Sequence, residues 1–282
     1  MTANHERHSE NAFCMQFHEL EKELNAKLRL IDKPAEYVST PEEMKNLKSA
    51  GKSVQIYIYY PLEYAADYHL GYLRKYLNGP KRVLFVGMNP STDGMLQHGI
   101  PFGNMSTVRR MGLQGEIKIP PQLHPDIKIE GMSWQKEEQS GERLWQLFEE
   151  MLSANPSNES EDFLDKFFKE CFVHNFCPLG LYNANGKYLS PEDMTVEYKD
   201  YRKQMEEECL EILEKQLELL QPKIVIALGG YVHGLLEKKS AYCKKHLLLK
   251  MLHPSPKSSA RSIFKKESKE LLLNYNIFSE NI

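Results

Sequence analysis

The sequence is poor in cysteine, and its apolar residues never form a long run. Its five cysteines include no CxxC pair, so neither a disulfide framework nor a cysteine-rich metal site is expected, and a reducing compartment fits best. No run of 18 or more apolar residues occurs, and residues 1–12 are polar. A transmembrane span and a secretory signal are therefore not expected.

The charge balance is close to neutral. Lys and Arg number 36, and Asp and Glu number 39, which leaves a formal net charge of −3. A protein that coats nucleic acid with its whole surface would be strongly basic, so that class is excluded, although a local basic patch is not. A chain of 282 residues buries about three quarters of its unfolded surface, which is enough for a stable α/β domain without a metal or disulfide.

Short apolar runs alternate along the chain with amphipathic stretches. Runs such as VLFVG and IVIALGG are typical of strands buried on both faces. Their alternation with helices predicts a largely parallel sheet covered by helices on both faces, a three-layer α/β/α fold. The expected strands are 54–60, 82–88, 171–175, 223–229 and 248–253. The expected helices are 62–77, 141–152, 161–169, 199–220, 231–244 and 262–275.

Residues 1–50 are expected to form an N-terminal extension to a main domain at 51–282. Its first 11 residues are expected to be frayed or disordered. From Phe13 onward, apolar residues recur at helical spacing and predict an amphipathic helix. A second helix start is expected at Thr40-Pro41-Glu42-Glu43, because Thr40 can cap the helix and Glu43 can complete a capping box.

Polar side chains follow three of the predicted strands, at the point where each strand ends. The segments are GMNPS at 87–91, VHNFCPL at 173–179 and MLHPSP at 251–256. In an open parallel sheet, ligands bind beyond the carboxyl ends of the strands. Asn89, Asn175 and His253 taken singly are typical of turn or loop residues, but together at separate strand ends they favour one shared site.

In order and spacing these segments resemble the single-strand-selective monofunctional uracil-DNA glycosylases, a branch of the uracil-DNA glycosylase superfamily. The resemblance covers residues 55–278 through the motifs YPLEYA, GPKRVLFVGMNP, GIPFG, CFVHNFCPL, GKYLSPEDM and HPSP. Each motif alone is weak, whereas the set is specific. It implies an enzyme that flips uracil, and some 5-modified uracils, out of DNA and hydrolyses the N-glycosidic bond without a cofactor or metal.

The resemblance also assigns roles to individual residues. His253 corresponds to the donor that faces the uracil O2 and stabilises the charge developing on the leaving base. Asn89 corresponds to the residue that orients the attacking water, and as an amide it cannot take the proton. Asn175 corresponds to the residue that reads N3–H and O4, Phe102 to the aromatic ring under the base, and the Met88 backbone amide to a further base contact.

The chain departs from the family pattern at two places. Ser91 stands where the family commonly has a glycine beside C5 of the base, so we expect a narrower preference for 5-substituted uracils. After HPSP the usual duplex-wedging segment is replaced by KSSARSIF. Ser255, Lys257 and Arg261 are therefore only candidate DNA contacts.

A local excess of positive charge surrounds His253. Residues 238–269 contain ten Lys or Arg and one acid, Glu267, whereas acidic residues such as Glu137 and Glu138 are expected to lie elsewhere. DNA phosphates are expected along this basic stretch, with an affinity that falls steeply as salt rises. A lone acid in the site loop, Asp93, is interpreted as a solvated loop residue.

Two other functions stay open on the sequence alone. A silent DNA-damage-binding protein would keep base flipping without cleavage, and the intact Asn89 and His253 argue against it. A hydrolase of free nucleosides would not need the basic stretch. Cys171, His174 and Cys177 are too far apart on an extended strand to share one metal ion. The resemblance further implies a nuclear monomer that acts on single- or double-stranded DNA, away from membranes.

Overall fold

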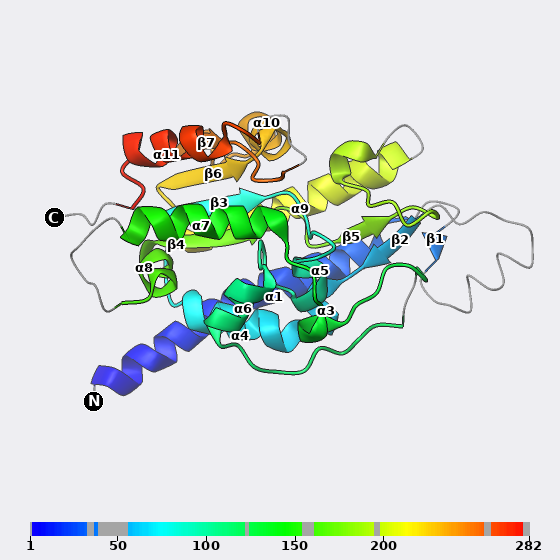
Figure 1. Cartoon of the computed structure of the whole chain (residues 1–282), viewed down its shortest axis with the longest axis horizontal. Coiled ribbons are helices and arrows are strands. Elements are labelled where there is room, and N and C mark those ends of the chain that lie inside the picture. The colour runs from blue at the N-terminus through cyan, green and yellow to red at the C-terminus, as the bar shows by residue number, and fades with distance from the viewer. Residues whose placement is uncertain are drawn as a thin grey trace, which may run out of the picture.

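The computed structural model describes residues 2–32, 37–38, 56–121, 124–153, 161–194, 198–256 and 261–278 (Figure 1). The helix start expected at Thr40 lies outside these residues. Among the helices described, none combines the length and the apolar character that crossing a membrane requires.

Four parallel strands form the central sheet in the order β4-β3-β6-β7. Every residue of the first three is buried, as expected for apolar strands covered on both faces. β7 lies at an edge, and part of it reaches solvent. The strands are β3 Val83–Gly87, β4 Cys171–Asn175, β6 Ile224–Leu228 and β7 Leu247–Met251.

The observed helices agree with the sequence prediction where the amphipathic pattern extends over many residues. The expected helix 62–77 divides at Ala65, whose backbone is not helical. α5 and α6 are too short to show a period, and the sequence pattern does not predict them. The α-helices are α1 Thr2–Leu30, α3 Pro61–Tyr64, α4 Ala66–Tyr76, α5 Met95–His98, α6 Met105–Met111, α7 Gln139–Ser153, α8 Phe163–Glu170, α9 Lys199–Leu220, α10 Gly230–Lys239 and α11 Phe264–Asn274. Two 3₁₀ turns, Gly131–Ser133 and Pro191–Asp193, complete the set.

Helices cover both faces of the sheet, which confirms the predicted three-layer fold. Leu84 of β3 pairs in register with Phe172 of β4, so these side chains share one face and Phe85 points to the other. The Phe172 ring lies 6.0 Å from Phe17 of α1, whereas the Phe85 ring lies 5.0 Å from Phe148 of α7. α1 and α7 therefore lie on opposite sides of the sheet.

The strand expected at 54–60 exists, but it does not belong to the central sheet. It is β2, Ile56–Tyr59, which pairs antiparallel with β5, Gly180–Tyr182, and parallel with β1, Tyr37–Val38. The sequence does not predict β5, because a strand of three residues shows no measurable alternation. These strands form a small second sheet beside the first (Figure 1).

The helix predicted from Phe13 is confirmed, and its backbone is helical from Thr2. Phe17, Leu24 and Leu28 are buried in the same hydrophobic core as the central sheet. Lys27 adds ion pairs to Glu208 and Glu211 of α9, although half-exposed pairs of this kind contribute little. Apolar burial therefore holds α1 against the rest of the fold.

Candidate functional site

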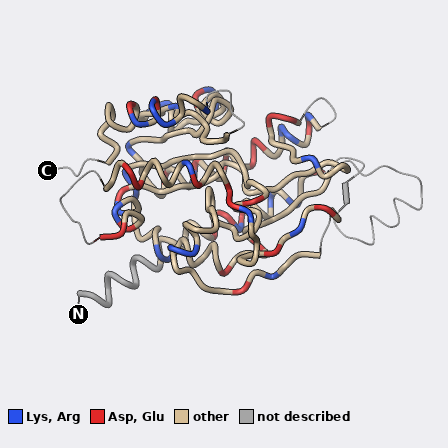
Figure 2. The backbone as a smooth tube through the Cα atoms, in the orientation of Figure 1, with Lys and Arg blue, Asp and Glu red and all other residues tan. Residues whose placement is uncertain are grey.

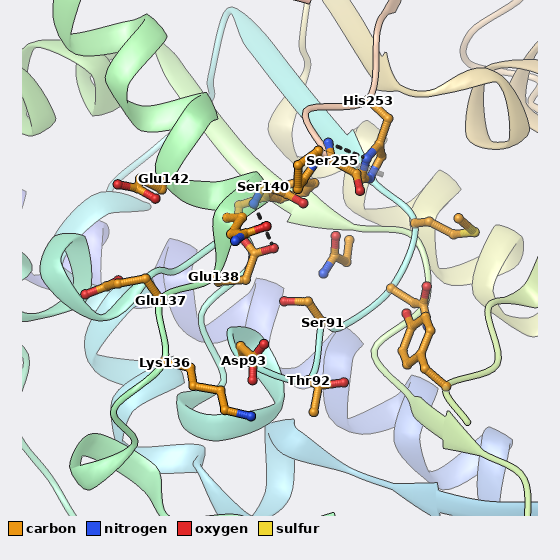
Figure 3. Close-up of a pocket in the computed structure, with 17 residues that line it drawn as sticks. Ser91, Thr92, Asp93, Lys136, Glu137, Glu138, Ser140, Glu142, His253 and Ser255 are labelled. Atoms are coloured by element: carbon orange, nitrogen blue, oxygen red, sulfur yellow. Dashed lines mark hydrogen bonds between the residues drawn. The ribbon is translucent and has the colours of Figure 1, made fainter. Parts of the chain in front are cut away.

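A cavity of about 720 Å³ opens at the carboxyl ends of β3, β4 and β7 (Figure 3). This is the edge where the sequence analysis expects ligands, and the volume is within the range of small-molecule sites. Of the expected site residues, seven line the cavity: Met88, Asn89, Ser91, Phe102, Asn175, His253 and Ser255. Arg261 is exposed and is not among the lining residues, and Lys257 lies outside the described residues.

Gly87 at the end of β3 allows two of these side chains to approach each other. A Cβ atom at this position would collide with Cε2 of Phe102 and with Oδ1 of Asn175. Because Gly87 has no side chain, the Phe102 ring and the Asn175 amide can both contact its backbone. Backbone hydrogen bonds from Phe176 to Gly87 and from Cys177 to Met88 hold the two strand ends together.

Phe102 is held in an unusual backbone conformation. Its φ angle is +52°, in the left-handed region that non-glycine residues adopt only where the surroundings enforce it. The indole N–H of Trp145 donates to the Phe102 carbonyl at 3.0 Å. His98 contacts the carbonyl of Gly103 at 3.0 Å. The ring of Phe102 is thus presented to the cavity by a turn that is fixed on several sides.

Asn175 carries an unused hydrogen-bond acceptor. The residue is 4% exposed, and its Oδ1 atom has no partner in the described part of the chain. Its Nδ2 atom lies 3.2 Å from the sulfur of Met95, which is a weak acceptor. Buried polar atoms are almost always paired, so this amide is placed to bind a ligand that offers a donor beside an acceptor.

His253 is a neutral imidazole with a defined proton position. The backbone N–H of Ser255 donates to Nδ1 at 3.1 Å (Figure 3), so the ring proton resides on Nε2. Burial lowers the pKa of His253 to about 4, which keeps the ring uncharged at neutral pH. Its centroid lies 6.2 Å from that of Phe102.

Asn89 is oriented by two neighbours. Its Nδ2 atom donates to the carbonyl of Leu179 at 3.4 Å, and its side chain hydrogen-bonds with the Tyr188 hydroxyl. Of the two amide atoms, the nitrogen donates to Leu179, and Oδ1 is the acceptor that the side chain offers. Tyr188 also lines the cavity, and sequence reasoning missed its role although it lies in the GKYLSPEDM motif.

The opposite wall of the cavity is acidic, which corrects one expectation. Glu137 and Glu138 were expected away from the site, but both line the cavity with Asp93 and Glu142 (Figure 3). The segment ahead of α7 folds back over the 99–103 turn, an approach that sequence spacing does not reveal. A residue of opposite sign, Lys136, lies at the far end of the cavity from His253 (Figure 3).

The two acids nearest the site are already engaged. Glu138 accepts backbone hydrogen bonds from Ser140 and Gly141 at the start of α7, and burial raises its pKa. One oxygen of Asp93 accepts from the indole N–H of Trp134 at 3.2 Å, so this partly exposed loop acid also has a structural partner. The sequence signal for Glu138 is its place just before a helix, where an acidic side chain caps free N–H groups.

The basic stretch at 238–269 is less charged in space than in sequence. Lys265 and Lys269 pair with Glu150 of α7, and Lys239 pairs with Glu206 of α9 at 3.4 Å. Figure 2 shows cations and acids interspersed over α10 and α11. Counting charges along the sequence overestimates the local excess, because acids from other elements fold against it. Glu206 is itself buried.

Metal ligation finds no support among the described residues, where no three His, Cys, Asp or Glu side chains gather in a suitable cluster. Cys171 and Cys177 are buried, and burial raises the pKa of the Cys171 thiol to about 12. A neutral thiol is a poor metal ligand and a poor nucleophile.

Fold and site together define a three-layer α/β/α protein with a cavity suited to a planar ligand that has hydrogen-bonding groups at its edge. The cavity offers such a ligand the aromatic ring of Phe102, the amide of Asn175 and the neutral imidazole of His253. The profile of the uracil DNA glycosylase superfamily matches residues 74–275. The chain therefore belongs to the uracil DNA glycosylase superfamily.

Relatives within the superfamily narrow the comparison. Single-strand selective monofunctional uracil DNA glycosylase from Bos taurus is 36% identical over 203 residues, 71% of this chain and 70% of its own length. The Rattus norvegicus protein of that name is also 36% identical, over 71% of this chain and 69% of its own. Among solved structures, wild-type SMUG2 from Pedobacter heparinus has a TM-score of 0.55 at 19% identity, covering 92% of this chain and 98% of that one. This last likeness shows the shared fold.

The first prediction concerns Gly87. Gly87→Ala should lower uracil excision by at least about 100-fold, because displacing reacting groups by an ångström costs that much, while overpacking lowers the stability of the folded protein by only about 1–3 kcal/mol. Gly79→Ala is the matched control, since nothing lies within 4 Å of a Cβ there. Wild-type excision by a folded Gly87→Ala protein would contradict this account.

The second prediction concerns the protonation of His253. Because its folded pKa is lowered to about 4 from an unfolded value of about 6.5, the ring should stay neutral as pH falls from 7 to 5. The stability that this neutral ring contributes is present above the unfolded pKa and is lost as pH falls toward the folded one. Nitrogen-15 NMR titration, with His253→Asn to assign the signal, measures the midpoint, and a value between 6 and 7 would refute the prediction.

Proposed function

We propose that this chain removes uracil from DNA by hydrolysing the bond between the base and deoxyribose. The observation that carries the proposal is the convergence of Asn89, Asn175 and His253 on one cavity together with Phe102. The membership of the uracil DNA glycosylase superfamily and the activity for which the mammalian relatives are named support the same reaction.

Base recognition follows from the unpaired amide of Asn175. A uracil flipped from the stack would donate its N3–H to the free Oδ1 atom and accept from Nδ2 at O4. Cytosine presents the reverse pattern at these two atoms, so it would leave both amide groups unsatisfied and be rejected. The ring of Phe102 provides a stacking surface worth about 1–3 kcal/mol per base.

Bond cleavage depends on His253. As the bond breaks, negative charge collects on the departing uracil, and the Nε2–H donor faces that charge at O2. A neutral donor that is already in place stabilises the transition state more than the ground state. One such donor typically contributes about 10²–10³ in rate.

Water attack depends on Asn89. Its Oδ1 atom accepts from water and directs a lone pair at the sugar, without taking a proton. Asp93 and Glu138 are engaged by Trp134 and by the start of α7, so neither is presented as a free general base. The reaction therefore relies on departure of the base and on geometry.

Among the described residues, Lys136 is the one lysine that lines the cavity, and its position agrees with monofunctional chemistry. Lys136 lies at the end remote from His253 (Figure 3), and its ammonium lies 5.3 Å from the ring centre of Trp134. A lysine that forms a Schiff base would have to reach the sugar beside the catalytic pair. Cleavage by water leaves an abasic site.

Ser91 sets the room beside the base in this proposal. Its hydroxyl points toward the wall that carries Glu138 (Figure 3), and a Cβ on Gly94 would lie 2.5 Å from Ser91 Oγ. The side chain occupies space that a glycine would leave open, so acceptance of 5-substituted uracils should be narrow. We also propose that the chain acts as a monomer in the nucleus, in line with the resemblance, and contacts DNA through Ser255 and the exposed part of the basic stretch.

The third prediction separates chemistry from binding. Asn89→Ala and His253→Leu should each lower turnover on a uracil oligonucleotide by at least about 100-fold while DNA affinity stays within about tenfold. Gel detection of abasic sites measures turnover, and fluorescence anisotropy measures binding.

Asn185→Ala serves as the matched control, since Asn185 is exposed and is not among the residues that line the cavity. Equal losses of binding and turnover would assign both residues to DNA positioning. Turnover of free deoxyuridine as fast as that of oligonucleotides would reassign the chain to nucleoside hydrolysis.

The fourth prediction concerns Ser91. Ser91→Gly should raise excision of 5-hydroxymethyluracil relative to uracil by about tenfold, the usual effect of one small group in a tight pocket. A side-by-side assay on the two bases measures the ratio, with uracil excision by the same variant as the internal control. Equal excision of both bases by the wild-type chain would show that Ser91 does not restrict the site.

A further inference from the structure

A buried carboxylate on the N-terminal helix lies behind the site. Glu21 of α1 is 1% exposed, and its two oxygens lie 2.8 and 2.9 Å from Nε2 of His69, which is fully buried on α4. His18 and His174 also face the carboxylate, at 3.5 and 4.0 Å. Burial alone would raise the pKa of Glu21, but these neighbours lower it to about 2.

The second nitrogen of His69 reaches the turn that carries Phe102. Nδ1 lies 2.7 Å from the carbonyl oxygen of Gly99. A carboxylate and a carbonyl are both acceptors, so both ring nitrogens donate and His69 is the charged form. Although burial disfavours the charge, Glu21 raises the pKa of His69. A charge-assisted chain therefore runs from α1 through α4 to the 99–103 turn.

This contact completes the support of a strained turn. The Gly103 N–H donates to the carbonyl of Ile100 at 3.0 Å. Trp145 donates to the carbonyl of Phe102, and His98 contacts that of Gly103. The Gly99 carbonyl is held by His69. A left-handed φ at Phe102 persists only where the surroundings over-determine it, and His69 supplies the charged member of those contacts.

Helix α1 also supports the other wall of the base slot, the space between the Phe102 ring and the Asn175 amide. Phe17 lies one turn before Glu21 and packs edge-on against His174 at 5.2 Å between ring centres. His174 directly precedes Asn175 and points away from the cavity, toward α1. Figure 1 shows α1 running along the sheet beside α4 and α9. α1 thus lies behind both the stacking ring and the reading amide.

We infer that Glu21 is a positioning residue for base recognition, acting through His69 on the turn that presents Phe102. This gives the N-terminal extension a part in the site, although the family resemblance assigns it none. The inference rests on the proposed function, because its main readout is uracil excision. Glu21 touches no substrate, and in this inference its effect passes through His69 to Phe102.

A double-mutant cycle tests this route. Glu21→Ala should lower kcat/KM for uracil excision by about tenfold in the wild-type background and by less than about twofold in a Phe102→Leu background, since coupled residues are not additive. Glu21→Gln keeps the hydrogen bond to His69 and should restore most of the loss. Glu19→Gln, an exposed position on the same helix that pairs only with Lys22, is the control and should change nothing.

A general loss of stability would give a different pattern. It would lower excision by the same factor in both backgrounds, which would overturn the inference, as would full activity of a folded Glu21→Ala protein. Should Glu21→Ala fail to fold, the Glu21→Gln cycle replaces it. A loss of about threefold that disappears in the Phe102→Leu background supports the route, and an equal loss in both overturns it.

A spectroscopic readout keeps this test separate from the proposed function. The chain has two tryptophans, and the Trp145 indole N–H donates to the Phe102 carbonyl. Its NMR resonance, assigned with Trp134→Phe, should move in Glu21→Ala and stay unchanged in Glu19→Gln. A resonance that does not move overturns the inference even in an active protein. If the wild-type chain excises no uracil but the resonance moves, the proposed function fails and the coupling stands.

Discussion

The site depends on how closely two side chains approach the backbone of Gly87. Phe102 and Asn175 come from segments far apart in the sequence, and both occupy the space where a side chain at this position would lie. A parallel sheet makes the approach possible, because the ends of β3 and β4, which carry Gly87 and Asn175, are paired at one edge. The ring and the amide then form two sides of a slot whose width is set by the backbone and not by a flexible side chain.

Neutral groups occupy the reactive part of this slot. His253 is uncharged because burial disfavours its protonated form, and Asn89 and Asn175 are amides. The carboxylates of the cavity lie on the opposite wall, where Trp134 and the start of α7 satisfy the nearest two. A departing uracil is therefore close to oriented hydrogen-bond donors and not to a carboxylate. This arrangement favours a leaving group that becomes negatively charged. Charged groups lie behind the site instead, where Glu21 and His69 hold the backbone carbonyl of Gly99.

Long apolar patterns made much of the fold predictable. Continuous apolar runs predict the four strands of the central sheet, an amphipathic pattern predicts the 22-residue helix α9, and three strand-end motifs locate the cavity. Patterns that are short or non-local were not predictable. The strand at 54–60 was assigned to the wrong sheet, because its partner β5 has three residues. Glu137 and Glu138 were placed away from the site, because only folding brings their segment over the 99–103 turn.

The sequence by itself determined the layer architecture, the superfamily and the residues that meet at the strand ends, since apolar period and motif order are local properties of the chain. The protonation, hydrogen bonding and charge pairing of the site follow only from the tertiary structure. The proton position on His253, the unpaired oxygen of Asn175 and the paired lysines around Glu150 all depend on neighbours distant in sequence. The tertiary structure also decided that α1 lies behind the base slot. Distances between such groups are set by packing, and no local pattern records them.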